Sequence, residues 1–98
     1  MALLEDAGLP EPSPEHHVRV DDHDYFIDLA YAALLIAIEL DDDSHNTEKA
    51  QEEDPIRQKR IESLGWLFIR ITWAELTEHP ERVVRRIREA IAARSGAR

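Results

Sequence analysis

The sequence predicts an α+β domain, a mixed four-stranded sheet with flanking helices in the order helix, three strands, helix, strand, helix. Three observations support this fold class. The 98 residues suit a single small domain. Short aliphatic stretches bounded by polar turns occupy the middle of the chain, as strands do. Two later segments end or begin with glycine and proline signals typical of helices. Residues 1–98 are therefore expected to form one domain.

The N-terminal residues predict a short helix followed by a connector. Residues 2–7 would form one or two helical turns that close at Gly8. The next stretch, GLPEPSPE, has three prolines within five residues and predicts extended backbone. Residues 1–15 are thus a short helix and a proline-rich lead-in, and the sheet and helices occupy residues 16–94.

Three strands are expected next. Residues 18–20 form a short strand and residues 21–24 a polar turn. Residues 25–31 and 34–41 are rich in β-favouring and aliphatic side chains, so each predicts a strand. Residues 42–53 are polar and could hold a helical turn capped by Thr47.

Asp54 is expected to cap a helix with Pro55 at its first position; this helix runs to Leu64 and stops at Gly65. Residues 66–72, WLFIRIT, are apolar on both faces except for Arg70, as in a central strand. A turn or short helix at 73–77 leads to a last helix that opens at His79-Pro80, and residues 95–98 form a flexible tail.

Composition limits the class of protein. The chain has no cysteine, which excludes disulfides and thiolate zinc sites and suits a reducing compartment. It has neither an apolar run of about 18 residues nor the pattern of a signal peptide, so a cytoplasmic protein without membrane contact is expected.

Charge is divided unevenly along the chain. The net charge of −9 argues against a simple nucleic-acid binder. Residues 1–56 hold 16 acids and 2 bases (net −14), and residues 57–98 hold 5 acids and 10 bases (net +5). The first part is suited to gathering metal ions and the second to meeting an anion, or the acids simply form a solvated surface.

Alternation along the two longer strands places three acids on one face. If Ala32-Ala33 formed a two-residue turn, Asp28 would lie opposite Ala37 and diagonal to Glu39, with Cβ atoms about 7 Å apart. Asp41 would lie on the same face of the sheet as Asp28 and Glu39. The opposite face would be an apolar core face made of Tyr25, Ile27, Leu29, Tyr31, Leu34, Ile36, Ile38 and Leu40.

Carboxylates this close repel unless a proton or a cation separates them. A hard divalent cation bound to oxygen ligands would relieve the repulsion, so the acids suggest a metal site. A solvated strand end, or a register shift of one residue that separates the acids, is the alternative.

Several linked motifs resemble a known family. The segments YFIDLAY, LLIAIELDDDSH, DPIRQKRIESLGWLFIRITWAEL and HPERVVRRI are similar to very-short-patch-repair-like endonuclease domains, members of the PD-(D/E)XK restriction-endonuclease-like superfamily. The resemblance covers about residues 7–94 and implies a restriction-endonuclease-like fold. It also implies metal-dependent phosphodiester hydrolysis, with DNA as the expected partner and RNA not excluded.

The resemblance also implies roles for particular residues. Asp28 and Glu39 would ligate Mg²⁺ or Mn²⁺, Asp41 would be a further ligand or an orienting acid, and His45 would act as a base or contact the phosphate. Four basic residues would hold the nucleic-acid backbone: Arg57, Lys59, Arg60 and Arg70.

Other readings of these residues are open. Arg57 would otherwise pair with Asp54 or Glu53 on its own helix. Arg70 lies in an apolar strand and needs a partner, which Asp28 or Glu39 would supply.

The chain departs from the family pattern at three places. Asp41 stands where the superfamily has lysine, Asp42 stands where the subfamily has glycine, and the first helix is nearly absent. A catalytically degenerate nuclease fold that acts as a nucleic-acid- or protein-binding accessory module is therefore the alternative function. An acidic mimic of DNA is a third possibility. The strand edge at residues 18–20 is compatible with a homodimer.

Overall fold

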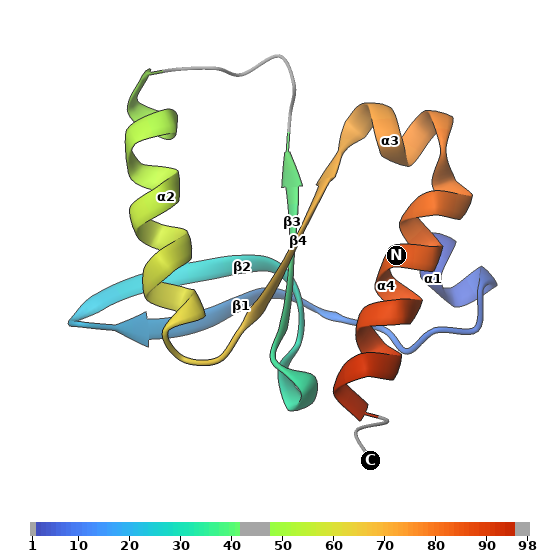
Figure 1. Cartoon of the computed structure of the whole chain (residues 1–98), viewed down its shortest axis with the longest axis horizontal. Helices are drawn as coiled ribbons and strands as arrows, with labels where there is room; N and C mark the ends of the chain where they lie inside the picture. The colour runs from blue at the N-terminus through green and yellow to red at the C-terminus, as the bar shows by residue number, and fades with distance from the viewer. Residues whose placement is uncertain (1, 42–47, 96–98) are drawn as a thin grey trace.

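The computed structural model describes residues 2–41 and 48–95, with side chains at residues 3–41 and 55–95. It confirms the α+β fold class, a four-stranded mixed sheet with flanking helices (Figure 1). The elements are α1 (Ala2–Asp6), β1 (Ser13–Val20), β2 (His23–Tyr31), the short 3-10 helix η1 (Ala32–Leu34), β3 (Ile36–Asp41), α2 (Glu48–Glu62), β4 (Leu67–Thr72), α3 (Trp73–Glu78) and α4 (Pro80–Ser95).

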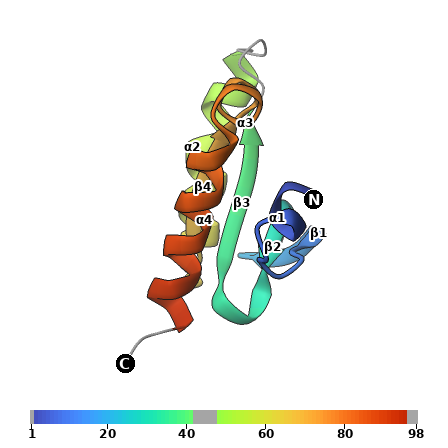
Figure 2. The same cartoon turned by 90° about the vertical axis from the view of Figure 1, so that its right-hand side faces the viewer.

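The strands follow the spatial order β1-β2-β3-β4. The pairs β1–β2 and β2–β3 are antiparallel, whereas β3 and β4 are parallel and are joined through α2. A parallel connection needs a crossover of a dozen or more residues, which α2 supplies. The β1–β2 hairpin extends away from β3 and β4 under α2, while α1, α3 and α4 lie on the other side of those strands (Figures 1 and 2).

The larger hydrophobic core lies between the sheet and α4. Val83 and Ile87 of α4 are fully buried against Ile36 and Ile38 of β3 and Ile71 of β4. Burial of one such side chain contributes roughly 1.5–3 kcal/mol to stability. The predicted helix opening at His79-Pro80 is confirmed, and the contact of α4 with the sheet fixes the orientation of β3 and β4.

A smaller core lies on the α2 side of the sheet. Ile61 of α2 is fully buried against Ile27 of β2, and it shares its cluster with Ala30, Ala37 and Trp66. Of the α2 side chains that the structure describes (residues 55–62), only Ile61 belongs to this core. Among the residues of the chain that the structure describes, no helix is long and apolar enough to cross a membrane.

Two predicted boundaries near the N-terminus were wrong. β1 begins at Ser13 and not at residue 18, because β1 lies at the sheet edge, where prolines such as Pro14 are tolerated. The turn between β1 and β2 is also shorter than predicted. Asp21 and Asp22 both have positive φ, 51° and 64°, as the central residues of a tight hairpin turn require, so β2 already begins at His23.

The connection between β2 and β3 was also predicted wrongly. It is not a two-residue turn at Ala32-Ala33 but η1 followed by Leu35 in the left-handed conformation (φ 56°). Two alanines are poor at the positive φ angles of a two-residue hairpin turn, so the chain takes a longer path. β3 therefore begins at Ile36, and its register against β2 moves by two residues.

The start of α2 was predicted seven residues too late, at Pro55. The helix begins at Glu48, and Pro55 lies inside it. The segment before Pro55 is rich in helix-favouring residues (EKAQEE), which offset the hydrogen bond that proline cannot donate. The predicted end was nearly right, because a turn at residues 63–65 follows Glu62 and Gly65 has φ 97°.

Candidate active site

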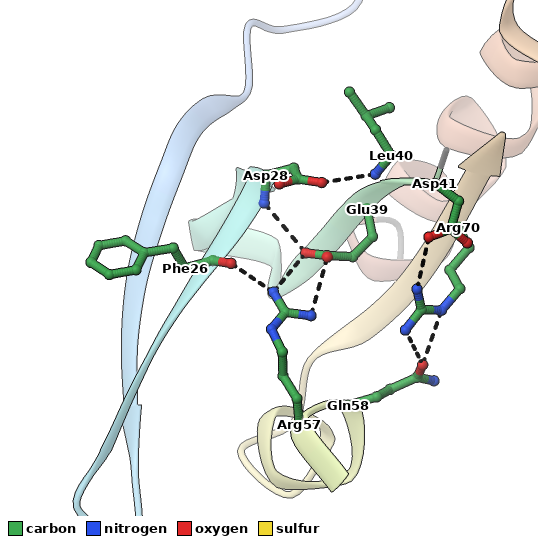
Figure 3. A network of polar contacts seen from close by, with 8 residues as sticks. All are labelled: Phe26, Asp28, Glu39, Leu40, Asp41, Arg57, Gln58 and Arg70. Carbon is green, nitrogen blue, oxygen red and sulfur yellow. Dashed lines mark hydrogen bonds and ion pairs between the residues drawn. The ribbon is translucent and has the colours of Figure 1, made fainter. Parts of the chain in front are cut away.

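The candidate site lies where β2 separates from β3. Leu29 pairs with Ile38, and the same register continued by one residue puts Asp28 opposite Glu39. The backbone ladder ends at this point and two side chains replace it (Figure 3). The Asp28 amide donates to Glu39 Oε2 at 3.3 Å, and the Leu40 amide donates to Asp28 Oδ2 at 2.9 Å. The two carboxylates therefore hold the strands together at the point where the sheet opens.

The separation reverses the faces of β2. Leu29 and Tyr31 pack into the α4-side core, but Ile27 and Tyr25 pack into the α2-side core. The prediction that all four share one core face was wrong, because β2 pairs with β3 only at Leu29–Tyr31 and its earlier part packs in the α2-side core. The prediction that Asp28 and Glu39 lie close together is correct, and the two residues are direct neighbours across β2 and β3. The register of β3 against β2 differs from the predicted one by two residues, and a shift of two keeps each side chain of β3 on its face.

Glu39 forms an ion pair with Arg57 of α2. Arg57 Nη1 lies 3.1 Å from Glu39 Oε1, and Nη2 donates to Oε2 at 3.1 Å and to the Phe26 carbonyl at 2.6 Å (Figure 3). The Glu39 and Arg57 side chains are only 10% and 18% exposed. This two-pronged contact is the geometry in which a guanidinium binds a carboxylate most strongly. Sequence reasoning assigned Arg57 to its own helix or to a phosphate and missed this contact.

Burial raises the pKa of Glu39 above its ordinary value, because loss of water disfavours the charged form. The Arg57 guanidinium acts in the opposite direction through its hydrogen bond and its charge, and the nearby Asp28 carboxylate raises the pKa of Glu39 further. Asp28 itself is exposed to solvent. The site thus pairs a buried carboxylate, held by a cation, with an accessible carboxylate beside it.

Asp41 lies further along β3 and binds Arg70 of β4. Arg70 Nη1 donates to Asp41 Oδ1 at 3.3 Å, while Arg70 Nε and Nη2 donate to Gln58 Oε1 of α2 at 3.2 and 2.9 Å. The sequence suggested Asp28 or Glu39 as the partner of Arg70. Arg70 stands opposite Glu39 in the β3–β4 register, but Arg57 already holds Glu39, and Arg70 contacts Asp41. Gln58 was not singled out from the sequence.

The other predicted residues are distributed around α2. Arg60 Nη1 donates to the Tyr25 hydroxyl at 2.7 Å, so it fastens α2 to the β1–β2 hairpin. Lys59 is exposed on the same helix. His45 and Asp42 fall outside the described residues.

Within residues 3–41 and 55–95, no three His, Cys, Asp or Glu side chains are grouped closely enough to hold a metal ion. Asp28 and Glu39 are two adjacent oxygen donors, and the guanidinium at Glu39 shows that this position accommodates a cation. The donor chemistry therefore fits a hard divalent cation. The ligand roles of Asp28, Glu39 and Asp41 and the role of His45 stay predictions.

Comparison with known proteins agrees with this fold. The model of the restriction endonuclease-like family REase_MTES_1575 matches residues 6–91. Neither a search of curated proteins nor a search of solved structures gave a match. Because the family model covers most of the chain, the chain belongs to the restriction endonuclease-like family REase_MTES_1575.

Proposed function

We propose that this restriction endonuclease-like chain is a metal-dependent DNA endonuclease of the very-short-patch-repair-like type, which nicks or cuts by phosphodiester hydrolysis. One observation carries the proposal: the exposed carboxylate of Asp28 lies beside the buried carboxylate of Glu39, on strands that diverge at that point. The family match supports a nuclease, and the acidic pair supplies the oxygen ligands that Mg²⁺ or Mn²⁺ prefers.

In this proposal Asp28 and Glu39 hold the cation. A bound Mg²⁺ would lower the pKa of a water molecule and screen the charge of the scissile phosphate. Asp41 is held by Arg70, which favours an orienting role over direct ligation. His45 follows β3 by four residues and would accept a proton or contact the phosphate.

The basic residues of α2 and β4 would bind the nucleic-acid backbone. Lys59 is exposed and available to a phosphate, whereas Arg57, Arg60 and Arg70 bind protein acceptors. Their positive charge offsets the acids of the site and reduces repulsion of a polyanion. DNA is the proposed partner. Incubation of the protein with DNA and with RNA, described below, would distinguish the two substrates.

A second function has one observation in its favour. Arg57 occupies both oxygens of Glu39, so a cation already neutralises this carboxylate. A nuclease fold that has lost catalysis and binds nucleic acid or protein would retain such a pair for stability. Nucleic-acid binding that is indifferent to divalent metal would support this alternative.

Plasmid nicking distinguishes the two functions. Supercoiled plasmid is incubated with the protein and Mg²⁺ or Mn²⁺, with EDTA as the metal-free control. Asp28→Asn and Glu39→Gln are compared with Glu75→Gln, which removes a more exposed Glu–Arg pair between α3 and α4, away from the site. We expect metal-dependent nicking that Asp28→Asn and Glu39→Gln each reduce by roughly two orders of magnitude, and that Glu75→Gln retains.

Two results would contradict the proposal. Full activity of folded Asp28→Asn would place the chemistry elsewhere in the chain. Absence of metal-dependent nicking by the native chain on plasmid, single-stranded DNA and RNA would favour the non-catalytic function.

A further inference from the structure

The Glu39–Arg57 pair occupies the atoms that a metal ion would need. Arg57 contacts Oε1 and Oε2 of Glu39, and Oε2 also accepts from the Asp28 amide. A divalent cation must approach these oxygens to about 2.0–2.6 Å. A guanidinium at 3.1 Å from both oxygens and a divalent cation beside them would also repel each other. Glu39 therefore cannot serve both cations fully at once.

The rest of α2 does not depend on Arg57 for its position. Ile61 is fully buried in the α2-side core, Arg60 binds the Tyr25 hydroxyl, and Gln58 binds Arg70. These contacts lie within one turn of Arg57 on the same helix. The Arg57 side chain can thus change partner while α2 stays docked on the sheet.

A released guanidinium would be well placed for a phosphate. Its fork of N–H groups matches phosphate oxygens as well as it matches a carboxylate. Lys59, two residues further along α2, is already exposed. The accessible Asp28 carboxylate, which Arg57 does not neutralise in the described contacts, gives an entering cation its first ligand.

We propose that Arg57 and a divalent cation exchange on Glu39: the cation displaces the guanidinium, which then binds a phosphate of the nucleic acid. The inference rests on the proposed metal site at Asp28 and Glu39 and adds its regulation. Because coupling between two ligands is reciprocal, nucleic acid that captures Arg57 would also strengthen cation binding at Glu39. In the absence of nucleic acid, Arg57 would hold cation affinity low.

Mn²⁺ binding by isothermal titration calorimetry, without nucleic acid, tests the exchange. The native chain is compared with Arg57→Gln, with Arg57→Lys, which keeps the charge but loses the two-pronged contact, and with Arg86→Gln. The last variant removes the Arg86–Glu75 pair and serves as the matched control. We expect Arg57→Gln to bind Mn²⁺ about 5- to 150-fold more tightly than the native chain, Arg57→Lys to lie between them, and Arg86→Gln to be unchanged.

The same titration with Asp28→Asn added to each chain separates this inference from the proposed function. If Mn²⁺ binding depends on Asp28, but both Arg57 variants bind Mn²⁺ no more tightly than the native chain, the metal site is supported and the exchange is wrong. If no chain binds Mn²⁺ in a manner that depends on Asp28, both are wrong. Should Arg57→Gln fail to fold, Arg57→Lys decides by itself, since tighter binding supports the exchange and equal or weaker binding overturns it.

The phosphate step has its own measurement. Fluorescence anisotropy of a labelled DNA duplex is recorded with and without Ca²⁺, which binds the same oxygen ligands. The exchange predicts that Ca²⁺ strengthens duplex binding more in the native chain than in Arg57→Gln. An equal gain in both chains would show that the guanidinium does not pass to the phosphate.

Discussion

The two faces of the sheet hold their helices by different means. α4 packs through a continuous apolar core in which Val83 and Ile87 are fully buried. Among the α2 side chains that the structure describes (residues 55–62), one aliphatic residue, Ile61, is fully buried, and Arg57, Gln58 and Arg60 make polar contacts. Apolar contacts are non-directional and fix the fold, whereas the polar contacts under α2 depend on charges that a ligand can redistribute. The face that is held by polar contacts is thus the face that carries Glu39.

The largest expected effect is on the α4 face. Ile87→Ala removes a fully buried side chain from the main core and should lower the free energy of unfolding by about 2–5 kcal/mol. Urea unfolding measures this loss. Ile56→Ala, on an exposed position of α2, is the control and should change stability by less than about 0.5 kcal/mol. Similar losses for the two variants would contradict the assignment of the core to this face.

Removal of Arg57 should have the next largest effect. Arg57→Gln leaves the buried Glu39 carboxylate without its cation and should cost about 2 kcal/mol in the free energy of unfolding. Much of this loss is the penalty of an unpaired buried charge. The double variant Arg57→Gln with Glu39→Gln should therefore recover at least half of it. A double variant as unstable as the sum of the two single variants would contradict the pairing.

The Asp41–Arg70 pair should matter less, because its side chains are 42% and 30% exposed. Asp41→Asn is expected to lower the free energy of unfolding by at most about 1 kcal/mol. The loss should shrink at high salt, which screens exposed pairs more than buried ones. Urea unfolding at low and high salt checks both statements, and a loss as large as that of Arg57→Gln would place Asp41 in the buried network.

The smallest effect in the native chain is the pH dependence from Glu39. Folding raises the pKa of this carboxyl, so the folded state binds its proton more tightly than the unfolded state. Its contribution to stability is therefore greatest below the unfolded pKa and is lost as pH rises through the folded pKa. Arg57 opposes the raised pKa, so the loss should be larger and extend to higher pH in Arg57→Gln. Urea midpoints across about pH 4 to 8, with Glu39→Gln as the control, measure the difference.

The order of elements and the pairing of Asp28 with Glu39 could be predicted because they depend on local patterns. Gly65 marks the end of one helix and His79-Pro80 the start of another. The predicted register of β3 was wrong by two residues, but the side chains of β3 still lie on the predicted faces of the sheet. The face reversal of β2 could not be predicted, because it depends on where β2 stops pairing with β3, which no local sequence pattern marks.

The partners of the arginines were equally hidden from sequence. A helix joined to the sheet by a crossover can meet any residue of one sheet face, so no spacing rule links Arg57 to Glu39 or Gln58 to Arg70. The early start of α2 shows a related limit, since an interior proline is normally a boundary signal. Only the packed structure decides which of these local signals prevails.

Carboxyl ¹³C NMR during a Mg²⁺ titration tests the central claim most directly, namely that the acids under α2 form a cation site. The side-chain carboxyl signals of Asp28, Glu39 and Glu75 are followed in the native chain without nucleic acid. A cation site at these acids predicts that the signals of Asp28 and Glu39 shift together and saturate, while that of Glu75, paired with Arg86, stays in place. Shifts of equal size at all three carboxyls, or none at Asp28 and Glu39, would contradict it.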